Sequence, residues 1–128
     1  VLNCAARVVS RVSKYEHITP TLASLHWLPV PQRVEYKLLL ITFKALNGMA
    51  PAYLAELLQW YRAPRSLRSN ALAKLVEPKT RLKHYGDRAF VKAAPCLWNG
   101  LPLSLRQISE VDEFKSALKT HLYTVAYG

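Results

Sequence analysis

The stretch that most constrains the fold is the run of residues 31–48, PQRVEYKLLLITFKALNG. At about 100° per residue its apolar side chains fall on two opposite faces of a helix. One face holds Val34, Leu38, Ile41 and Ala45, and the other holds Tyr36, Leu39, Leu40, Phe43 and Leu46. Only narrow polar seams separate the two faces, and Thr42 lies in one of them. The pattern predicts a central helix that is buried on two sides.

The ends of this helix are also marked in the sequence. Pro31 suits a first helical turn, where its missing N–H group is not needed. Gly48 suits the left-handed position that follows a last turn, and Pro51 prevents the helix from continuing. We therefore expect a helix over residues 31–48.

Further helices are predicted on both sides of the central one. Residues 3–13 have an amphipathic pattern that also fits a strand, because valine is β-branched. Thr19 and Pro20 read as the N-cap and first residue of a short helix, and Pro51 opens another helix. A last helix should begin at Ser109, which forms a capping box with Asp112.

The C-terminal third should contain one more helix, which begins after residue 87 with Asp87 as its cap and ends at Asn99 and Gly100. Pro95 is expected to kink or split it. Trp27 and Trp98 each lie among leucines at a predicted helix end, so we expect both to be structural side chains.

These elements predict a mainly α fold, a small helical domain of about five or six helices around the central buried helix. The chain of 128 residues is expected to form a single domain. Residues 1–30 form a first helical part, 31–61 a helical hairpin, 62–86 a basic irregular or β-hairpin segment, and 87–128 the C-terminal helices. Because the sequence begins with Val1, we expect it to be a piece of a longer protein.

Positive charge is concentrated in one part of the chain. The formal net charge is +10, and residues 62–92 hold nine Lys or Arg against two acidic residues, a local balance of +7. A charge of this size favours a polyanionic partner. The candidate nucleic-acid-binding residues are Arg62, Arg65, Arg68, Lys74, Lys79, Arg81, Lys83 and Arg88.

Aromatic residues lie between these cations, namely Tyr61, His84 and Tyr85. Cations meet phosphates and rings stack on unpaired bases, so the mixture favours RNA or single-stranded DNA over duplex DNA. The alternative is a solvated basic face whose aromatic side chains pack inward.

Several chemistries lack the residues that they need. The two aspartates, Asp87 and Asp112, are too few for a two-metal phosphoryl-transfer site, and no glycine-rich phosphate loop is present. Cys4 and Cys96 lack metal-ligand spacing and suggest an intracellular protein. We therefore expect no catalytic residues, no metal, no cofactor, no small-molecule substrate and no membrane-spanning segment.

Four ordered strings carry a resemblance to a known family: HITPTLASLHWLPVPQRVEYKLLLITFKALNGMAPAYL, LRS, YGDRAFVKAAPCLWNGLP and FKSALKTHLY. Together they resemble the region downstream of the reverse transcriptase domain in jockey-like non-LTR (LINE-type) retrotransposon polyproteins. The opening NCAARVV is similar to a run at the end of that polymerase's thumb. Cys96 and Gly100 depart from the family's APxLWNxLP pattern, where an Arg-like and a Ser-like residue are expected.

The resemblance implies that residues 1–30 are the end of the thumb and its linker. It implies a non-catalytic accessory domain of an RNA-directed DNA polymerase, which binds template RNA or target DNA. The implied partners are nucleic acid and the reverse transcriptase core of the same polyprotein, in the nucleus and cytoplasm. The alternative is a structural or protein-interaction module that docks on the polymerase thumb without contacting nucleic acid.

Overall fold

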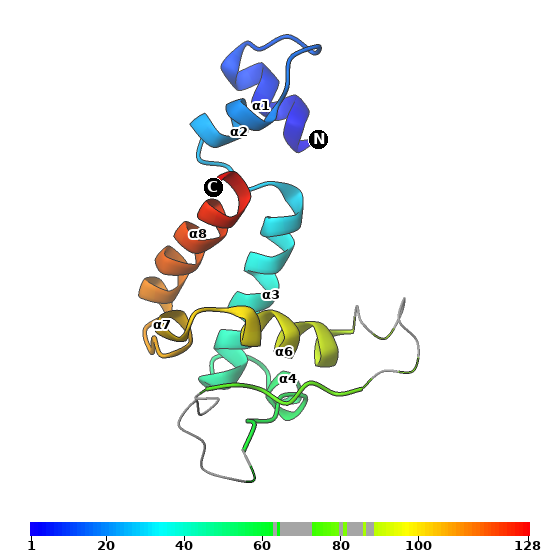
Figure 1. The fold of residues 1–128 in the computed structure, drawn as a ribbon, viewed down its shortest axis with the longest axis vertical. Coiled ribbons are helices and arrows are strands. Elements are labelled where there is room, and N and C mark those ends of the chain that lie inside the picture. The colour runs from blue at the N-terminus through cyan, green and yellow to red at the C-terminus, as the bar shows by residue number, and fades with distance from the viewer. Residues whose placement is uncertain (63, 65–72, 80, 82–85, 87–88) are drawn as a thin grey trace.

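The structure, a computed structural model, describes residues 1–62, 64, 73–79, 81, 86 and 89–128. These residues form a small, mainly helical domain, as the sequence predicts (Figure 1). Its helices are α1 (Leu2–Ser10), α2 (Thr19–Ser24), α3 (Val30–Leu46), α4 (Ala52–Glu56), α6 (Phe90–Gly100), α7 (Leu103–Arg106) and α8 (Val111–Tyr127). The molecule is elongated, with α1 and α2 at one end, α3 and α8 side by side in the middle, and α4 and α6 at the other end.

The core lies where α6 and α8 both pack against α3. Phe43 of α3 stacks on Phe114 of α8 with ring centroids 4.2 Å apart, and Trp98 of α6 lies 6.0 Å from the same ring. Phe43 and Phe114 are fully buried, and Trp98 is 2% exposed. Aromatic pairs in such offset or tilted arrangements stabilise a core beyond their buried area. Aromatic rings thus join α3 to two helices that are distant from it in sequence.

The central helix is buried along the Leu39 face, and on the opposite predicted face only Ala45, 3% exposed, is fully buried. The prediction of burial on two sides along the whole helix is therefore wrong. Leu39 and Phe43 face the core, whereas Val34 is 54% and Ile41 is 39% exposed. The reason is that α6 and α8 both lie against the Leu39 face. Thr42, predicted in a polar seam, is fully buried, and its hydroxyl donates a hydrogen bond to the carbonyl of Leu38 at 2.8 Å.

The C-terminal end of α3 follows the prediction closely. Gly48 has φ +70°, in the left-handed region, and no atom lies within 4 Å of the place that a Cβ would occupy. The N–H of Met49 bonds the carbonyl of Lys44 at 2.8 Å, which satisfies a carbonyl of the last turn. A side chain would have space at this position, so crowding does not require a glycine there. Glycine is favoured because the backbone of Gly48 is in the left-handed conformation.

Two predicted helix starts are displaced by one residue. Thr19 is the first residue of α2, with Ile18 as the N-cap, and α8 has Glu110 as its N-cap without a side-chain capping bond. The predicted capping box is therefore wrong: Asp112 instead bonds Lys115 at 3.0 Å. An acidic residue in the first turn still interacts favourably with the helix dipole.

Other boundaries also differ from the prediction. The first helix ends at Ser10, because Arg11 turns into the left-handed region with φ 54°. The helix after Pro51 is the single short α4, although Leu58 beyond it is buried. Pro95 lies inside α6 without splitting it. The predicted cap Asp87 lies outside the described residues.

The N-terminal helix pair is held to the rest of the molecule by the last helix. Within the pair, the guanidinium of Arg7 donates hydrogen bonds to the carbonyls of Ser13 and Glu16. Across the molecule, the hydroxyl of Tyr123 donates to the carbonyl of Ala23 at 2.9 Å, and that of Tyr127 donates to the carbonyl of Trp27 at 2.5 Å. Burial raises the pKa of Tyr127 above its ordinary value.

Candidate nucleic-acid interface

Two extended stretches of chain lie side by side, one directly before residue 62 and the other, residues 74–76, inside the basic segment. Trp60 and Leu75 form an antiparallel bridge. The N–H of Tyr61 donates to the carbonyl of Lys74 at 2.9 Å, and the N–H of Val76 donates to the carbonyl of Gln59 at 2.8 Å. Residues 59–61 and 74–76 therefore pair as two short antiparallel stretches.

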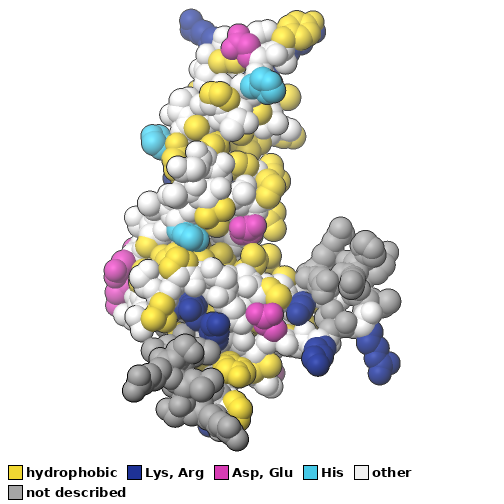
Figure 2. Space-filling model, in the orientation of Figure 1, with side chains coloured by type: hydrophobic (Ala, Val, Ile, Leu, Met, Phe, Trp, Pro, Cys, Tyr) yellow, Lys and Arg dark blue, Asp and Glu magenta, His cyan; other side chains and the backbone are white. Residues whose placement is uncertain are grey.

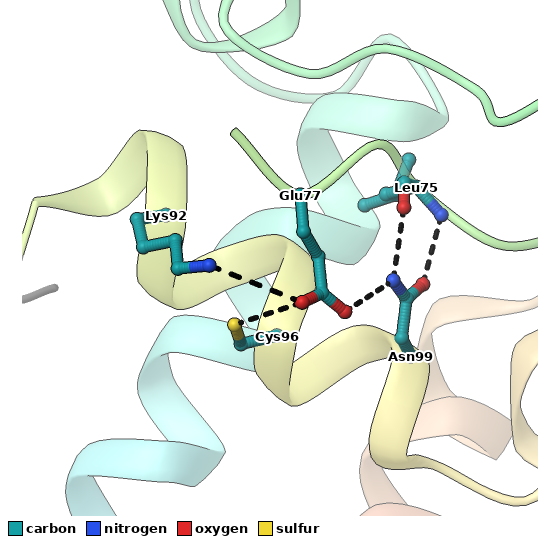
Figure 3. A network of polar contacts seen from close by, with 5 residues as sticks. All are labelled: Leu75, Glu77, Lys92, Cys96 and Asn99. Carbon is teal, nitrogen blue, oxygen red and sulfur yellow. Dashed lines mark hydrogen bonds and ion pairs between the residues drawn. The ribbon is translucent and has the colours of Figure 1, made fainter. Parts of the chain in front are cut away.

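The second of these stretches is fixed to the domain by two side chains of α6, as Figure 3 shows for Asn99. The amide of Asn99 accepts from the N–H of Leu75 at 2.8 Å and donates to its carbonyl at 2.9 Å. The indole N–H of Trp98 donates to the carbonyl of Ala73 at 2.8 Å. Asn99 therefore satisfies the backbone of Leu75, which is 2% exposed, as a neighbouring strand would. We call these contacts of Trp98 and Asn99 the α6 clamp.

Glu77 adds a polar network to the α6 clamp. Its carboxylate accepts hydrogen bonds from Asn99 at 2.8 Å and from the thiol of Cys96 at 3.4 Å, and it lies 4.0 Å from the ammonium of Lys92 (Figure 3). The bond from Asn99, the bond from Cys96 and the charges of Lys92 and Lys74 lower the pKa of Glu77, against the opposing effect of burial. Burial and the bond to Glu77 raise the pKa of the Cys96 thiol. The carboxylate is therefore held in its charged form.

The predicted binding residues divide into two groups. Arg65, Arg68, Lys83 and Arg88 lie outside the described residues. Of the others, Arg62, Lys79 and Arg81 are exposed, and Lys74 is half-buried. Among the described residues, no carboxylate lies within 4 Å of the charged atoms of these four side chains. The charges of Arg62, Lys79 and Arg81 are therefore available to an anionic partner, whereas the charge of Lys74 also acts on Glu77.

On the face drawn in Figure 2, Lys and Arg side chains gather at the lower end of the molecule, around the two segments drawn in grey. The elongated upper part carries mainly hydrophobic and uncharged side chains on this face. On this face the gathered Lys and Arg side chains contribute a positive potential at the lower end of the molecule.

The role of Asn99 is not evident from the sequence, in which this residue reads as part of a helix end. The signal available was the adjacent pair Trp98 and Asn99 in APCLWNGLP, two hydrogen-bonding side chains on one turn. Lys92 contributes to the charge of residues 62–92, but its position beside Glu77 depends on tertiary structure. Trp98, Asn99 and Lys92 thus position the basic segment, and they are not among the residues predicted to contact nucleic acid.

The described residues contain no group of three or more His, Cys, Asp or Glu side chains arranged to hold a metal ion. Cys4 and Cys96 are free thiols. In the part of the chain that the structure describes, no helix is long and apolar enough to cross a bilayer.

Comparison of the chain with protein-family descriptions, with curated proteins and with solved structures gives no match. The function proposed below therefore rests on the charge and geometry of the chain and on the resemblance carried by its sequence.

Proposed function

We propose that this chain is a non-catalytic accessory domain of a non-LTR retrotransposon reverse transcriptase, which binds template RNA or target DNA through its basic segment. The observation that carries the proposal is the exposed group Arg62, Lys79 and Arg81, which has no acidic partner among the described residues and lies on chain leading to and from the α6 clamp. The local balance of +7 over residues 62–92 supports the same function.

Anchoring the base of the segment reduces the entropic cost of binding. A chain that is fixed at points along its length has fewer conformations to lose when its cations contact phosphates. The α6 clamp and the bridge between Trp60 and Leu75 supply this fixation. The segment would therefore present its cations from one place on the surface instead of acting as a free basic tail.

The proposal is tested with a segment triple variant, Arg62→Gln, Lys79→Gln and Arg81→Gln. Binding of a labelled oligouridine strand is measured by fluorescence anisotropy over a series of salt concentrations. Each lost phosphate contact should reduce the salt slope of the logarithm of the binding constant by about 0.7 on a single strand, so up to about 2 units should be lost. All three side chains are exposed, so the helical circular dichroism should be unchanged.

A matched control is the triple variant Arg33→Gln, Lys37→Gln and Lys119→Gln, which removes the same charge from exposed positions on α3 and α8. We call it the groove triple variant, because the three side chains line a hollow between these two helices. It should retain the parent's salt slope, because its positions are not in the basic segment. Equal losses in both triple variants would show that binding follows net charge alone, which contradicts a localised interface.

The second candidate function is a protein-interaction module that docks on a polymerase thumb. It is favoured by one observation: Val8 and Val9 of α1 are 78% and 62% exposed. Adjacent exposed valines on a helix are a small apolar surface that a partner could cover. Two results together would favour this candidate: the parent chain does not bind oligouridine, and Val8→Asp abolishes docking of the chain on the polymerase thumb.

A further inference from the structure

A second surface with distinct chemistry lies at the other end of α3. The amino-terminal half of this helix, the α2–α3 linker and α8 enclose an open groove of about 850 Å³. Figure 1 shows these elements side by side in the upper half of the molecule, away from α4 and the grey segments. We call it the α3–α8 groove. It stands apart from the basic segment, so a role for this groove does not depend on the function proposed for that segment.

The lining of the α3–α8 groove is largely apolar. Leu28 of the linker is 7% exposed, while Val30 and Val34, one turn apart on α3, are 57% and 54% exposed. Trp27, Tyr36 and Leu40 also line the groove and are half-buried. Exposed aliphatic side chains on successive turns beside a hollow are typical of sites that take the apolar stripe of a helix.

The charged side chains that line the groove are all basic. Arg33 and Lys37 come from α3, and Lys119 comes from α8. All three are exposed, and no carboxylate lies within 4 Å of their charged atoms in the part of the chain that the structure describes. His26 is a further basic side chain in the lining. None of the described residues that line the groove is acidic. A complementary partner is therefore both apolar and acidic.

We propose that the α3–α8 groove binds an amphipathic, acidic helix of a partner protein. The apolar stripe of that helix covers Val30 and Val34, and acidic residues flanking the stripe pair with Arg33, Lys37 and Lys119. The most exposed apolar side chains of the groove, Val30 and Val34, are aliphatic and offer no ring on which a base can stack. The rings of Trp27 and Tyr36 are half-buried, and that of His26 lies 5.5 Å from the ring of Tyr123, so the exposed lining favours a protein helix over nucleic acid. The cations determine which helix binds and the apolar contacts supply most of the affinity.

The probe is a designed, labelled peptide with leucine at helical positions i, i+3, i+4 and i+7 and glutamate at the flanking positions. Two control peptides have lysine in place of glutamate, or the same composition in scrambled order. Fluorescence anisotropy with the full chain should show saturable binding of the acidic helix, and binding roughly tenfold weaker for each control. Equal binding of all three peptides, or no binding of the acidic one, overturns the proposal.

Substitutions then locate the site. Val34→Asp should weaken binding of the acidic peptide roughly tenfold, whereas Val125→Asp should not. Val125 is the matched control because it is 60% exposed on α8 and does not line the groove. Both positions are exposed, so circular dichroism should show that both variants fold.

The two triple variants separate this proposal from the proposed function. The groove triple variant should lose the acidic peptide and keep oligouridine, and the segment triple variant should do the reverse. If the groove triple variant loses oligouridine and keeps the peptide, the groove is a nucleic-acid site and the proposal is wrong. If Val34→Asp leaves peptide binding unchanged, the peptide binds elsewhere and the proposal is also wrong.

Discussion

Replacing Asn99 by alanine should destabilise the domain far more than an ordinary polar substitution. The change removes the bonds of 2.8 and 2.9 Å to the N–H and carbonyl of Leu75, and the bond of 2.8 Å to Glu77. Leu75 is 2% exposed, so water cannot easily replace Asn99. Each buried backbone group left without a partner costs about 1 to 3 kcal/mol.

The two backbone groups of Leu75 set the size of the effect. Because some relaxation will occur, we expect a total loss of about 2 to 4 kcal/mol in the free energy of unfolding. The bond to Glu77 adds little, since the Glu77 side chain is 42% exposed and water can solvate it. For a domain of this size the loss corresponds to a fall in Tm of roughly 10 °C.

Urea unfolding followed by circular dichroism measures this loss, with Asn47→Ala as the control. The Asn47 side chain also donates to a backbone carbonyl, that of Phe43 at 2.8 Å, but it is exposed at the end of α3. Its removal should cost about 1 kcal/mol or less. A loss below about 0.5 kcal/mol for Asn99→Ala, the size of a surface change, would refute the role of the α6 clamp.

Burial and charge support three more predictions. Leu39→Ala should cost about 2 to 5 kcal/mol in urea unfolding, but Ile41→Ala about 1 kcal/mol or less, because these side chains are 1% and 39% exposed; similar losses would contradict the one-sided burial of α3. Glu77→Gln should lower stability above pH 4.5, the ordinary pKa of this group, and the difference should shrink as pH falls through the lowered pKa of the folded protein; a difference that grows in acid would contradict the network. Trp98, 2% exposed, should be protected from iodide quenching and Trp60, 50% exposed, should not, as measured on single-tryptophan variants; equal quenching of the two would contradict their placement.

Periodicity predicted the elements that depend on local sequence. An example is the apolar stripe that the sequence predicts on the last helix, made of Val111, Phe114, Leu118, Leu122 and Val125. Its three central residues are buried as their spacing indicates, whereas Val125 near the end of α8 is 60% exposed. Gly48 is another, because a left-handed φ after a helix follows from the residue itself. The position of Trp98 among leucines likewise predicted a structural side chain, and it is buried in the core.

The errors arise where the outcome depends on distant parts of the chain. Both faces of α3 are apolar, and only the position of α6 and α8 decides that Leu39 is buried while Val34 is not. The role of Asn99 requires an extended stretch 24 residues away. For the capping box, the sequence pattern is present, but α8 starts one residue late, so Asp112 is not three residues after the N-cap.

For the candidate interface, the sequence located the positive charge but not the contacts that hold the basic segment to the domain. Arg62, Lys79 and Arg81 were selected by composition, and their exposure agrees with a surface role. The antiparallel bridge of Trp60 with Leu75 could not be located from sequence, because a single pair of bridged residues has too little alternation to be recognised.

The phenol groups of α8 have a consequence for the order of folding. Tyr123 and Tyr127 each bond a carbonyl that precedes them by 100 residues. Closing a loop of that length is entropically costly and slow compared with forming local helical contacts. During synthesis, α1 and α2 emerge before α8, yet the bonds from Tyr123 and Tyr127 can form only after α8 has left the ribosome.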